Sequence, residues 1–423
     1  MPMAKIKKIS AYEIIDSRSF PTIEARMVLD NGHEVLSAIP AGTSVGKYEA
    51  HELRDGDTDR FDGMGVKDAV SLINNTLGPK LIGVDPLRQS EIDQWLVGVN
   101  NANNQKIGSN TILAISQLSL KAGAAVEGIP LFKYVNQLFK KIFKTDIKLQ
   151  KIPTPIFNVI NGGKHANNNL DIQEFQLIPS SRFSFTQAYE TGVELFHEIE
   201  KVLVYRNANI SVGEEGGFAP NLSTNVDAFE ILDESISRRN LKSGIDVFLG
   251  MDMAASHYFK DQRYVIRDKP QPLNRNDYID FILKLLKDYS FLVVEDPLNQ
   301  DDFEGWIKLN KLISDKIYLI GDDLLVTNKE RLQMAIKEKA CNAILIKPNQ
   351  IGTITQTLEV VNVARQNDFT CIVSHRSGET NDDLIADFAV GIQSEFVKFG
   401  APSRGERVAK YNRLWQIERQ ELK

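Results

Sequence analysis

The stretch Ala343-Ile344-Leu345-Ile346-Lys347 is an apolar run that ends in a lysine, and proline and glycine punctuate the residues directly after it. Its length and its β-branched content predict a buried strand that delivers one amine to the edge of a loop. Five further apolar runs end in an ionisable residue, and helix-like segments lie between most of the six. This alternation predicts an α/β fold, and a long series of equal units favours a closed (β/α) barrel. The residues at the six strand ends are Asp252, Glu295, Asp322, Lys347, His375 and Lys398.

The charged residues at these strand ends have two interpretations. One charged strand end is most often an ordinary solvated terminus, but six together favour chemistry, because the active sites of such barrels lie at the carboxyl ends of the strands. The carboxylates of Asp252, Glu295 and Asp322 suit a hard divalent ion such as Mg2+. Lys347, held near other cations, can have a lowered pKa and act as a base. We therefore interpret the barrel mouth as the active site.

Composition and length limit the class of protein. The 423 residues are 42% hydrophobic and 25% charged, which is typical of a soluble globular chain, and the length suits a barrel plus one smaller domain. The net charge of −6 excludes a global basic field, so no nucleic-acid partner is expected. The sequence has no apolar run near the roughly 18 residues of a membrane helix, so no membrane is expected. It also has no recognisable secretory signal, and Cys341 and Cys371 are expected to be buried, reduced thiols in the cytoplasm.

The chain divides into two predicted domains. Strand patterns over residues 5–39 and helical patterns over 68–138 predict an N-terminal α+β domain at 1–145, and a proline-bracketed segment marks its boundary. A glycine-punctuated loop at 40–46 is interpreted as a mobile lid, with a plain surface loop as the alternative. Residues 146–423 are predicted to form the barrel and to carry the active site.

Two loops of the second domain carry further candidate residues. Glycines and asparagines surround His165, which suits a flexible active-site loop, although a lone histidine is more often structural. Glu214 and Glu215 lie between glycines. Adjacent carboxylates are often only a solvated turn, but near a metal site they become candidates for a general acid.

Several motifs make the sequence recognisable. They are Asn158 to His165, Glu295-Asp296-Pro297, Gly321 to Leu324, Lys347 to Gly352, Ser374 to Thr380 and Lys398 to Pro402. Together and in this order they resemble the enolase family, the glycolytic phosphopyruvate hydratases, and the resemblance extends over essentially the whole chain. It implies a small N-terminal α+β domain followed by an enolase-type modified (β/α)8 barrel with some antiparallel start.

The resemblance also implies a reaction, the Mg2+-dependent and reversible dehydration of 2-phospho-D-glycerate to phosphoenolpyruvate and water. Asp252, Glu295 and Asp322 would hold one Mg2+ per active site, and Ser44 would bind a second that arrives with the substrate. Lys347 would remove the C2 proton to give a doubly charged aci-carboxylate. Removing a proton beside a carboxylate that is already anionic requires concentrated positive charge, which explains the need for metal.

Other roles follow from the same resemblance. Glu215, helped by Glu174, would protonate the departing C3 hydroxyl, and Lys398 would add a second positive charge at the substrate carboxylate. Closure of the 40–46 lid would exclude water from the site. The remaining contacts to substrate would come from His165, Gln173, Glu174, His375 and Ser44, with Arg376 and Ser377 at the phosphate. Enolases are commonly homodimers and sometimes homo-octamers, and no residue of this sequence decides between the two.

The sequence departs from the family pattern mainly in the lid, where Ala41 and Val45 replace a serine and a threonine. Further departures are Ser19-Phe20, Glu214 and the run Asn167 to Asn169, and none of them removes a catalytic group. Three hypotheses follow, in decreasing order of support. The chain is a working enolase, or a paralogue that acts on a related phospho- or phosphono-acid, or a scaffold that uses its lysine-rich segment at 140–151 or its terminal lysine as a contact.

Overall fold

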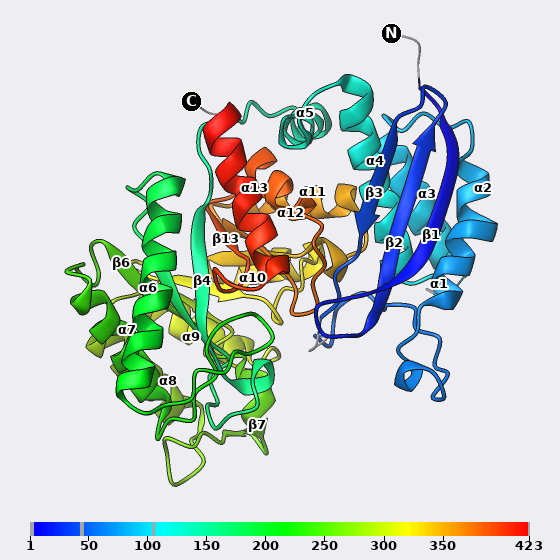
Figure 1. Cartoon of the computed structure of the whole chain (residues 1–423). Coiled ribbons are helices and arrows are strands. Elements are labelled where there is room, and N and C mark those ends of the chain that lie inside the picture. The colour runs from blue at the N-terminus through cyan, green and yellow to red at the C-terminus, as the bar shows by residue number, and fades with distance from the viewer. Residues whose placement is uncertain (1–3, 43–45, 104–105, 422–423) are drawn as a thin grey trace.

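The N-terminal part of the molecule is a small antiparallel sheet beside a larger barrel (Figure 1). The computed structural model describes residues 4–42, 46–103 and 106–421. The three strands of the sheet are β1 (Ile6–Ile15), β2 (Pro21–Leu29) and β3 (Glu34–Ala38). Gly32, at φ +89°, closes the predicted hairpin between β2 and β3, because glycine adopts this conformation without strain. The strands predicted over residues 5–39 are confirmed.

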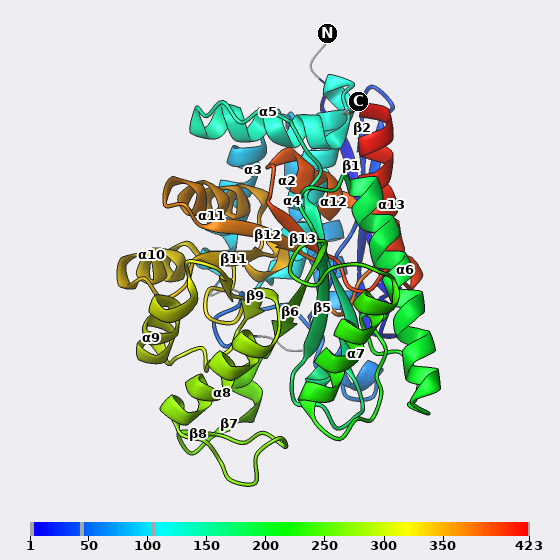
Figure 2. The same cartoon turned by 90° about the vertical axis from the view of Figure 1, so that its left-hand side faces the viewer.

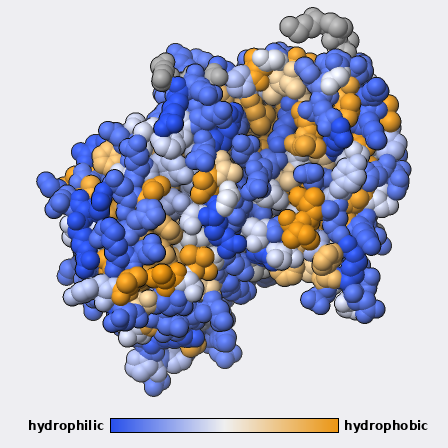
Figure 3. Space-filling view, in the orientation of Figure 1, coloured by the Kyte–Doolittle hydropathy of each residue, from blue (hydrophilic) through white to orange (hydrophobic). Residues whose placement is uncertain are grey.

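Helices cover one face of this sheet, and Figure 1 shows them behind the strands. The other face exposes Tyr12 and Leu36, and orange groups lie over this part of the surface in Figure 3. The last helix of the series, α5, packs instead on the barrel helix α12 (Leu384–Gly391). In chain order the helices are α1 (Lys67–Leu72), α2 (Gly78–Leu81), α3 (Gln89–Ala102), α4 (Ser109–Glu127) and α5 (Leu131–Phe143), with a 3-10 turn at Phe61–Gly63 and a π turn at Ile73–Leu77.

Eight strands close the barrel in the order β10-β11-β12-β13-β4-β5-β6-β9. These are β4 (Thr154–Asn161), β5 (Glu174–Pro179), β6 (Val247–Asp252), β9 (Phe291–Glu295), β10 (Tyr318–Gly321), β11 (Ala343–Ile346), β12 (Thr370–Ser374) and β13 (Phe396–Lys398). All six strands predicted from apolar runs are present. Their inward side chains fill the barrel with an apolar core, formed by Ile156, Ile178, Val293, Ile320, Ala343, Leu345, Ile372 and Phe396.

One strand of the barrel runs against the others. β5 is antiparallel to both β4 and β6, while the remaining neighbours are parallel. A direct β4–β5 connection therefore replaces the helical crossover that two parallel neighbours require. Consequently the beginning of β5, not its end, lies at the barrel mouth. The modified barrel with an antiparallel start is confirmed.

Helices surround the barrel on the outside, and Figure 2 shows α8 to α11 on one flank and α6 with α13 on the other. The helices after β5 are α6 (Phe185–Tyr205), α7 (Asn225–Arg238), α8 (Arg275–Asp288), α9 (Phe303–Ile313), α10 (Lys329–Glu338), α11 (Ile354–Gln366), α12 and α13 (Gly405–Glu421). A short hairpin, β7 (Phe259–Lys260) with β8 (Arg263–Tyr264), follows β6. Capping boxes at Ser184 and Thr224 define the first turns of α6 and α7.

The connection from α5 to β4 contains the predicted domain boundary at 145/146, which stays a prediction. Both predicted thiols are buried and free. Among the described residues, no single helix is long and apolar enough to cross a membrane. The pair α4 and α5 passes that test together, by length and composition only, and is bent by 102°.

Candidate active site

The ionisable residues predicted at the six strand ends lie together at the barrel mouth. Three of them end their strands and three follow directly after theirs, so the parallel arrangement brings all six to the same end of the barrel. A cavity opens there. Its lining is Gly42, Glu49, His165, Gln173, Glu174, Glu215, Asp252, Asp322, Lys347, Ser374, His375, Arg376, Ser377 and Lys398. Two other predicted site residues are Glu295, which is fully buried against Lys398, and Ser44, which lies outside the described residues.

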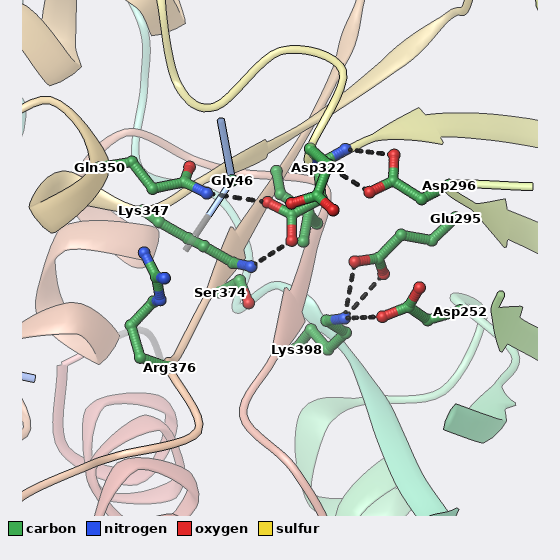
Figure 4. Close-up of polar contacts among 12 residues, drawn as sticks. Gly46, Asp252, Glu295, Asp296, Asp322, Lys347, Gln350, Ser374, Arg376 and Lys398 are labelled. Carbon is green, nitrogen blue, oxygen red and sulfur yellow. Dashed lines mark hydrogen bonds and ion pairs between the residues drawn. The ribbon is translucent and has the colours of Figure 1, made fainter. Parts of the chain in front are cut away.

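The amine of Lys398 lies among carboxylates, as Figure 4 shows for Glu295 and Asp252. Its Nζ donates to the two oxygens of Glu295 at 2.9 and 2.7 Å and to those of Glu174 at 3.1 Å. Asp252 Oδ2 lies 3.7 Å away. Burial would lower the pKa of Lys398, but Glu174 and Glu295 raise it well above its usual value. The amine therefore stays charged.

The antiparallel β5 explains why Glu174 joins this group. Glu174 is in register with Asp252, and Asp252 with Glu295, so one carboxylate oxygen of each lies within 4.8 Å of the others. Burial raises the pKa of Glu174 to about 8, although Lys398 opposes the shift. Burial and Asp252 raise the pKa of Glu295 well above its usual value. Three oxygen donors at this spacing are a donor set that a divalent cation accepts.

Lys347 forms an ion pair with Asp322 (Figure 4). Its Nζ donates to Asp322 Oδ2 at 2.5 Å, and Gln350 Nε2 donates to Asp322 Oδ1 at 3.0 Å. Burial, Arg376 and Lys398 lower the pKa of Lys347, but Asp322 outweighs them and the net shift is upward. The expectation of a lowered lysine pKa is therefore wrong for this arrangement, because the nearest charge to the amine is an anion.

Asp322 belongs to a second group of acidic residues, in which Asp296 binds the backbone of Asp322. Asp296 is buried and accepts hydrogen bonds from the backbone N–H groups of Asp322 and Asp323 at 3.0 and 2.7 Å. Burial and Asp323 raise the pKa of Asp296 well above its usual value. Burial and Asp322 raise the pKa of Asp323 to about 7. Asp322 has the opposite shift, because Lys347 lowers its pKa against the effect of burial. Asp322 is thus the member of the group that is most readily ionised.

Arg376 lies on the side of the cavity next to the N-terminal part. Its Nη1 and Nη2 donate to the two oxygens of Glu49 at 2.8 and 3.2 Å, and both side chains are 5% exposed. The backbone of Ala41 pairs with that of Gly378 through two hydrogen bonds of 2.8 and 2.9 Å. A Cβ at Gly42 would lie 1.9 Å from Arg376 Nη2, so a side chain there would displace the guanidinium. The described end of the predicted lid at Gly42 therefore lies against this arginine.

Glu215 is buried between two histidines on the side of the cavity near β4. His165 Nδ1 lies 3.5 Å from Glu215 Oε1 and 3.6 Å from Glu174 Oε1. His375 Nε2 lies 3.3 Å from Glu215 Oε2, and Asn158 Nδ2 donates to the same oxygen at 2.9 Å. Burial would raise the pKa of Glu215, but His165 and His375 lower it well below its usual value. Gln173, also predicted, donates to Asp252 Oδ2 at 3.1 Å.

Sequence reasoning missed several of the residues that contact the predicted ones. Asn158, Asp296 and Gln350 lie inside motifs that were recognised, so the motif position could have revealed them. Glu49 and Arg407 lie outside every motif, and no pattern in the sequence distinguishes them from ordinary charged residues.

Comparison with known proteins agrees with this geometry. A family model described as the enolase N-terminal domain matches residues 6–135, and one described as the enolase C-terminal TIM barrel domain matches residues 149–422. The enolase of Ehrlichia ruminantium (strain Welgevonden) is 42% identical over 420 residues, which are 99% of this chain and 97% of that protein. The enolase of Ehrlichia canis (strain Jake) is 42% identical over 416 residues, or 98% and 96% of the two chains.

Proposed function

We infer the reaction from the family: this chain belongs to the enolase family, whose members are phosphopyruvate hydratases, hydro-lyases of glycolysis. We propose that it converts 2-phospho-D-glycerate reversibly to phosphoenolpyruvate and water. The single observation that carries the proposal is the cavity itself, in which Lys347 and Glu215 line the same space with Lys398 and Arg376. A base, an acid and two anion-binding cations are what this elimination requires.

The family implies a divalent metal ion, and the donor set fits one. Carboxylate oxygens of Asp252 and Glu295 lie within 4.8 Å of each other and of Glu174, and carboxylates are the hard ligands that Mg2+ prefers. We propose that Asp252, Glu295 and Asp322 would hold Mg2+, and that Ser44 would bind a second ion that arrives with the substrate. When bound, the ion would neutralise the substrate carboxylate and stabilise the doubly anionic aci-carboxylate.

Lys347 is the proposed base, and its surroundings explain how its basicity depends on Asp322. Asp322 raises the pKa of Lys347, while Arg376 and Lys398 lower it. When the Asp322 carboxylate no longer pairs with Lys347, the positive charges of Arg376 and Lys398 favour the neutral amine. The neutral amine can accept the C2 proton. Lys398 stays protonated among its acids and supplies a fixed positive charge for the substrate carboxylate.

Glu215 is the proposed acid, and Glu174 is the proposed source of its proton. Glu215 is ionised because of its histidine neighbours, whereas Glu174, with a pKa of about 8, is mostly protonated at neutral pH. His165 lies within 3.6 Å of both carboxylates. A proton can therefore move through this group to the departing C3 hydroxyl, which fits an acid–base pair whose pKa values are pushed apart.

Arg376 and Ser377 are the proposed phosphate ligands, because a guanidinium binds phosphate oxygens with a pair of parallel hydrogen bonds. In the described structure the guanidinium of Arg376 donates its hydrogen bonds to the carboxylate of Glu49. The phosphate must share Arg376 with this carboxylate or replace it. His375, His165 and Gln173 would complete the contacts with the rest of the substrate.

The test is the rise in ultraviolet absorbance as 2-phosphoglycerate becomes the conjugated enol phosphate, measured with Mg2+ and again with excess chelator. We expect a rise that requires Mg2+. No rise from folded protein that still binds Mg2+ would contradict the proposal, and turnover of a related phospho- or phosphono-acid would then support the paralogue with a changed lid.

The assembly, the location and the partners of the protein are also part of the proposal. We propose a homodimer or homo-octamer in the cytoplasm, acting on a small-molecule substrate without nucleic acid or membrane. Sedimentation of the purified chain would distinguish the two assemblies, and a monomer would contradict both.

A further inference from the structure

Arg407 connects two loops of the active site from behind. It is the third residue of α13 and is fully buried. Its Nη1 donates to His375 Nδ1 and to the backbone oxygen of Arg376, both at 2.6 Å. Its Nη2 donates to the backbone oxygens of Ser377 at 2.5 Å and Glu214 at 3.2 Å. One guanidinium thus holds the segment after β12 and the segment that carries the proposed acid.

The backbone around this guanidinium is fitted to it. Gly400 has φ +86°, and a Cβ at this position would lie 2.7 Å from the backbone oxygen of Glu215, 3.0 Å from His375 Cε1 and 3.1 Å from Arg407 Cδ. Only glycine allows so close an approach at this φ. The backbone of Glu215, the imidazole of His375 and the aliphatic part of Arg407 therefore pack around Gly400 with no room for another side chain.

The chemistry of arginine decides which tautomer of His375 fits. A guanidinium only donates hydrogen bonds, and it is not deprotonated in proteins. The ring nitrogen that faces it, Nδ1, must therefore accept through its lone pair, and the neutral ring carries its hydrogen on Nε2. Nε2 is 3.3 Å from Glu215 Oε2 and makes no hydrogen bond with any described residue. His375 itself is 2% exposed and lines the cavity.

We propose that Arg407 is a positioning residue that fixes His375 as the Nε2–H tautomer and aims this donor at Glu215 and the departing hydroxyl. The proposal deepens the proposed function and rests on it for the identity of the hydroxyl. Burial, with a contribution from Arg407, lowers the pKa of His375 to about 3 against the effect of Glu215. His375 is then a neutral donor, which orients groups and does not act as the base.

The alternative is that Arg407 only binds backbone carbonyls and stabilises the fold. The two roles differ in what happens to His375, so the first measurement is made on the unmodified protein. We would label the full chain with 15N-histidine and record long-range 1H–15N correlation spectra, which distinguish the two tautomers. The chain has 6 histidines, and the signal absent from a His375→Gln variant identifies this one. The Nε2–H tautomer is expected, and the Nδ1–H tautomer or a protonated ring at pH 7 would overturn the proposal.

Substitution then tests the role of Arg407 itself. Lysine keeps the charge but loses the planar fork, so it cannot serve His375 and the carbonyls together. In Arg407→Lys we expect a mixture of tautomers and about a tenfold lower kcat for 2-phosphoglycerate, with KM changed much less. A folded Arg407→Lys protein with the wild-type tautomer and the wild-type kcat would overturn the proposal.

A matched control lies on the same helix. Arg413 donates to both oxygens of Asp387 at 2.7 Å and does not line the cavity. Arg413→Gln should lower thermal stability and leave the His375 signal and kcat unchanged. The tautomer is read without turnover, so a protein that shows the Nε2–H form but no reaction would contradict the proposed function and not the tautomer assignment.

Discussion

The two arcs of the barrel mouth differ in how they carry their chemistry. From β9 to β13, repeated strand–helix units place Glu295, Asp322, Lys347, His375 and Lys398 at successive strand ends. From β4 to β6 the pattern is irregular, because only Asp252 ends a strand there and the other side chains come from loops and from the beginning of an antiparallel strand. The regular arc supplies the proposed base and most of the fixed charge. The irregular arc supplies the proposed acid and the groups that control its proton.

The largest effect is expected in the regular arc, at the base. Lys347→Ala removes the amine that would take the C2 proton, and a positioned base contributes up to about 10⁴-fold to rate. We expect kcat to fall by about that factor, measured as phosphoenolpyruvate formation at saturating Mg2+. Lys337→Ala, an exposed lysine of α10, is the control and should behave as wild type. Normal turnover by Lys347→Ala would exclude the proposed mechanism.

The corresponding change in the irregular arc is Glu215→Gln. It keeps the shape and the buried environment but removes the proton-transfer group, so kcat should fall by about 10³-fold. The neighbouring Glu214→Gln is the matched control, because Glu214 contributes its backbone oxygen to Arg407 and does not line the cavity. If Glu214→Gln lost as much activity as Glu215→Gln, the choice of Glu215 as the acid would be wrong.

The same contrast explains how much the sequence could predict. Strands in the regular arc are buried apolar runs with a charge at the end, so Lys347 and its neighbours are readable from the pattern alone. Nothing in the pattern marks β5 as antiparallel, and the position of Glu174 at the mouth follows only from that direction. The family resemblance, and not periodicity, therefore predicts Glu174 and Gln173 as site residues. It also predicts Ser377.

Contacts between distant segments are a second limit of the sequence. Arg407 contacts the backbone oxygen of Arg376, which is 31 residues away in the sequence. Glu49 contacts the guanidinium of Arg376 and is 327 residues away. Their partners depend on how α13 and the N-terminal part pack on the barrel. The lowered pKa expected for Lys347 was wrong for the same reason, because the sequence could not say which of its many charged neighbours lies nearest.

A metal-binding experiment shows which arc supplies the third carboxylate of the cation site. Glu174 lies with Asp252 and Glu295 within 4.8 Å, so it competes with Asp322 to be the third ligand of the site. Asp322 is ionised. Mg2+ at 100 times its Kd should stabilise wild type by about 2.7 kcal/mol, seen as a higher Tm that chelator reverses. We expect Asp322→Asn to lose this effect and Glu174→Gln to keep it. The reverse result would move the site into the irregular arc.

Acid stability gives the smallest effect and tests the junction of the two arcs, where His375 of the regular arc faces Glu215 of the irregular one. The pKa of His375 is about 3 in the folded protein and near 6.5 when unfolded. The unfolded chain therefore binds more protons, and the stability that the neutral ring gives is full above pH 6.5 and is lost as pH falls toward 3. At pH 5 the loss should be about 2 kcal/mol.

Buried acids complicate this measurement and dictate its form. Asp323, with a pKa of about 7, takes up protons in the folded protein over the same range and offsets part of the loss. We would therefore measure the free energy of unfolding of wild type and of His375→Gln, and compare the difference between the two proteins at pH 7 and at pH 5. Unfolding is by urea, with chelator present. The difference should shrink by about 2 kcal/mol at the lower pH, whereas the exposed His197→Gln should follow wild type. Equal pH slopes for wild type and His375→Gln would mean that His375 is not held neutral, and the two arcs would not be coupled through it.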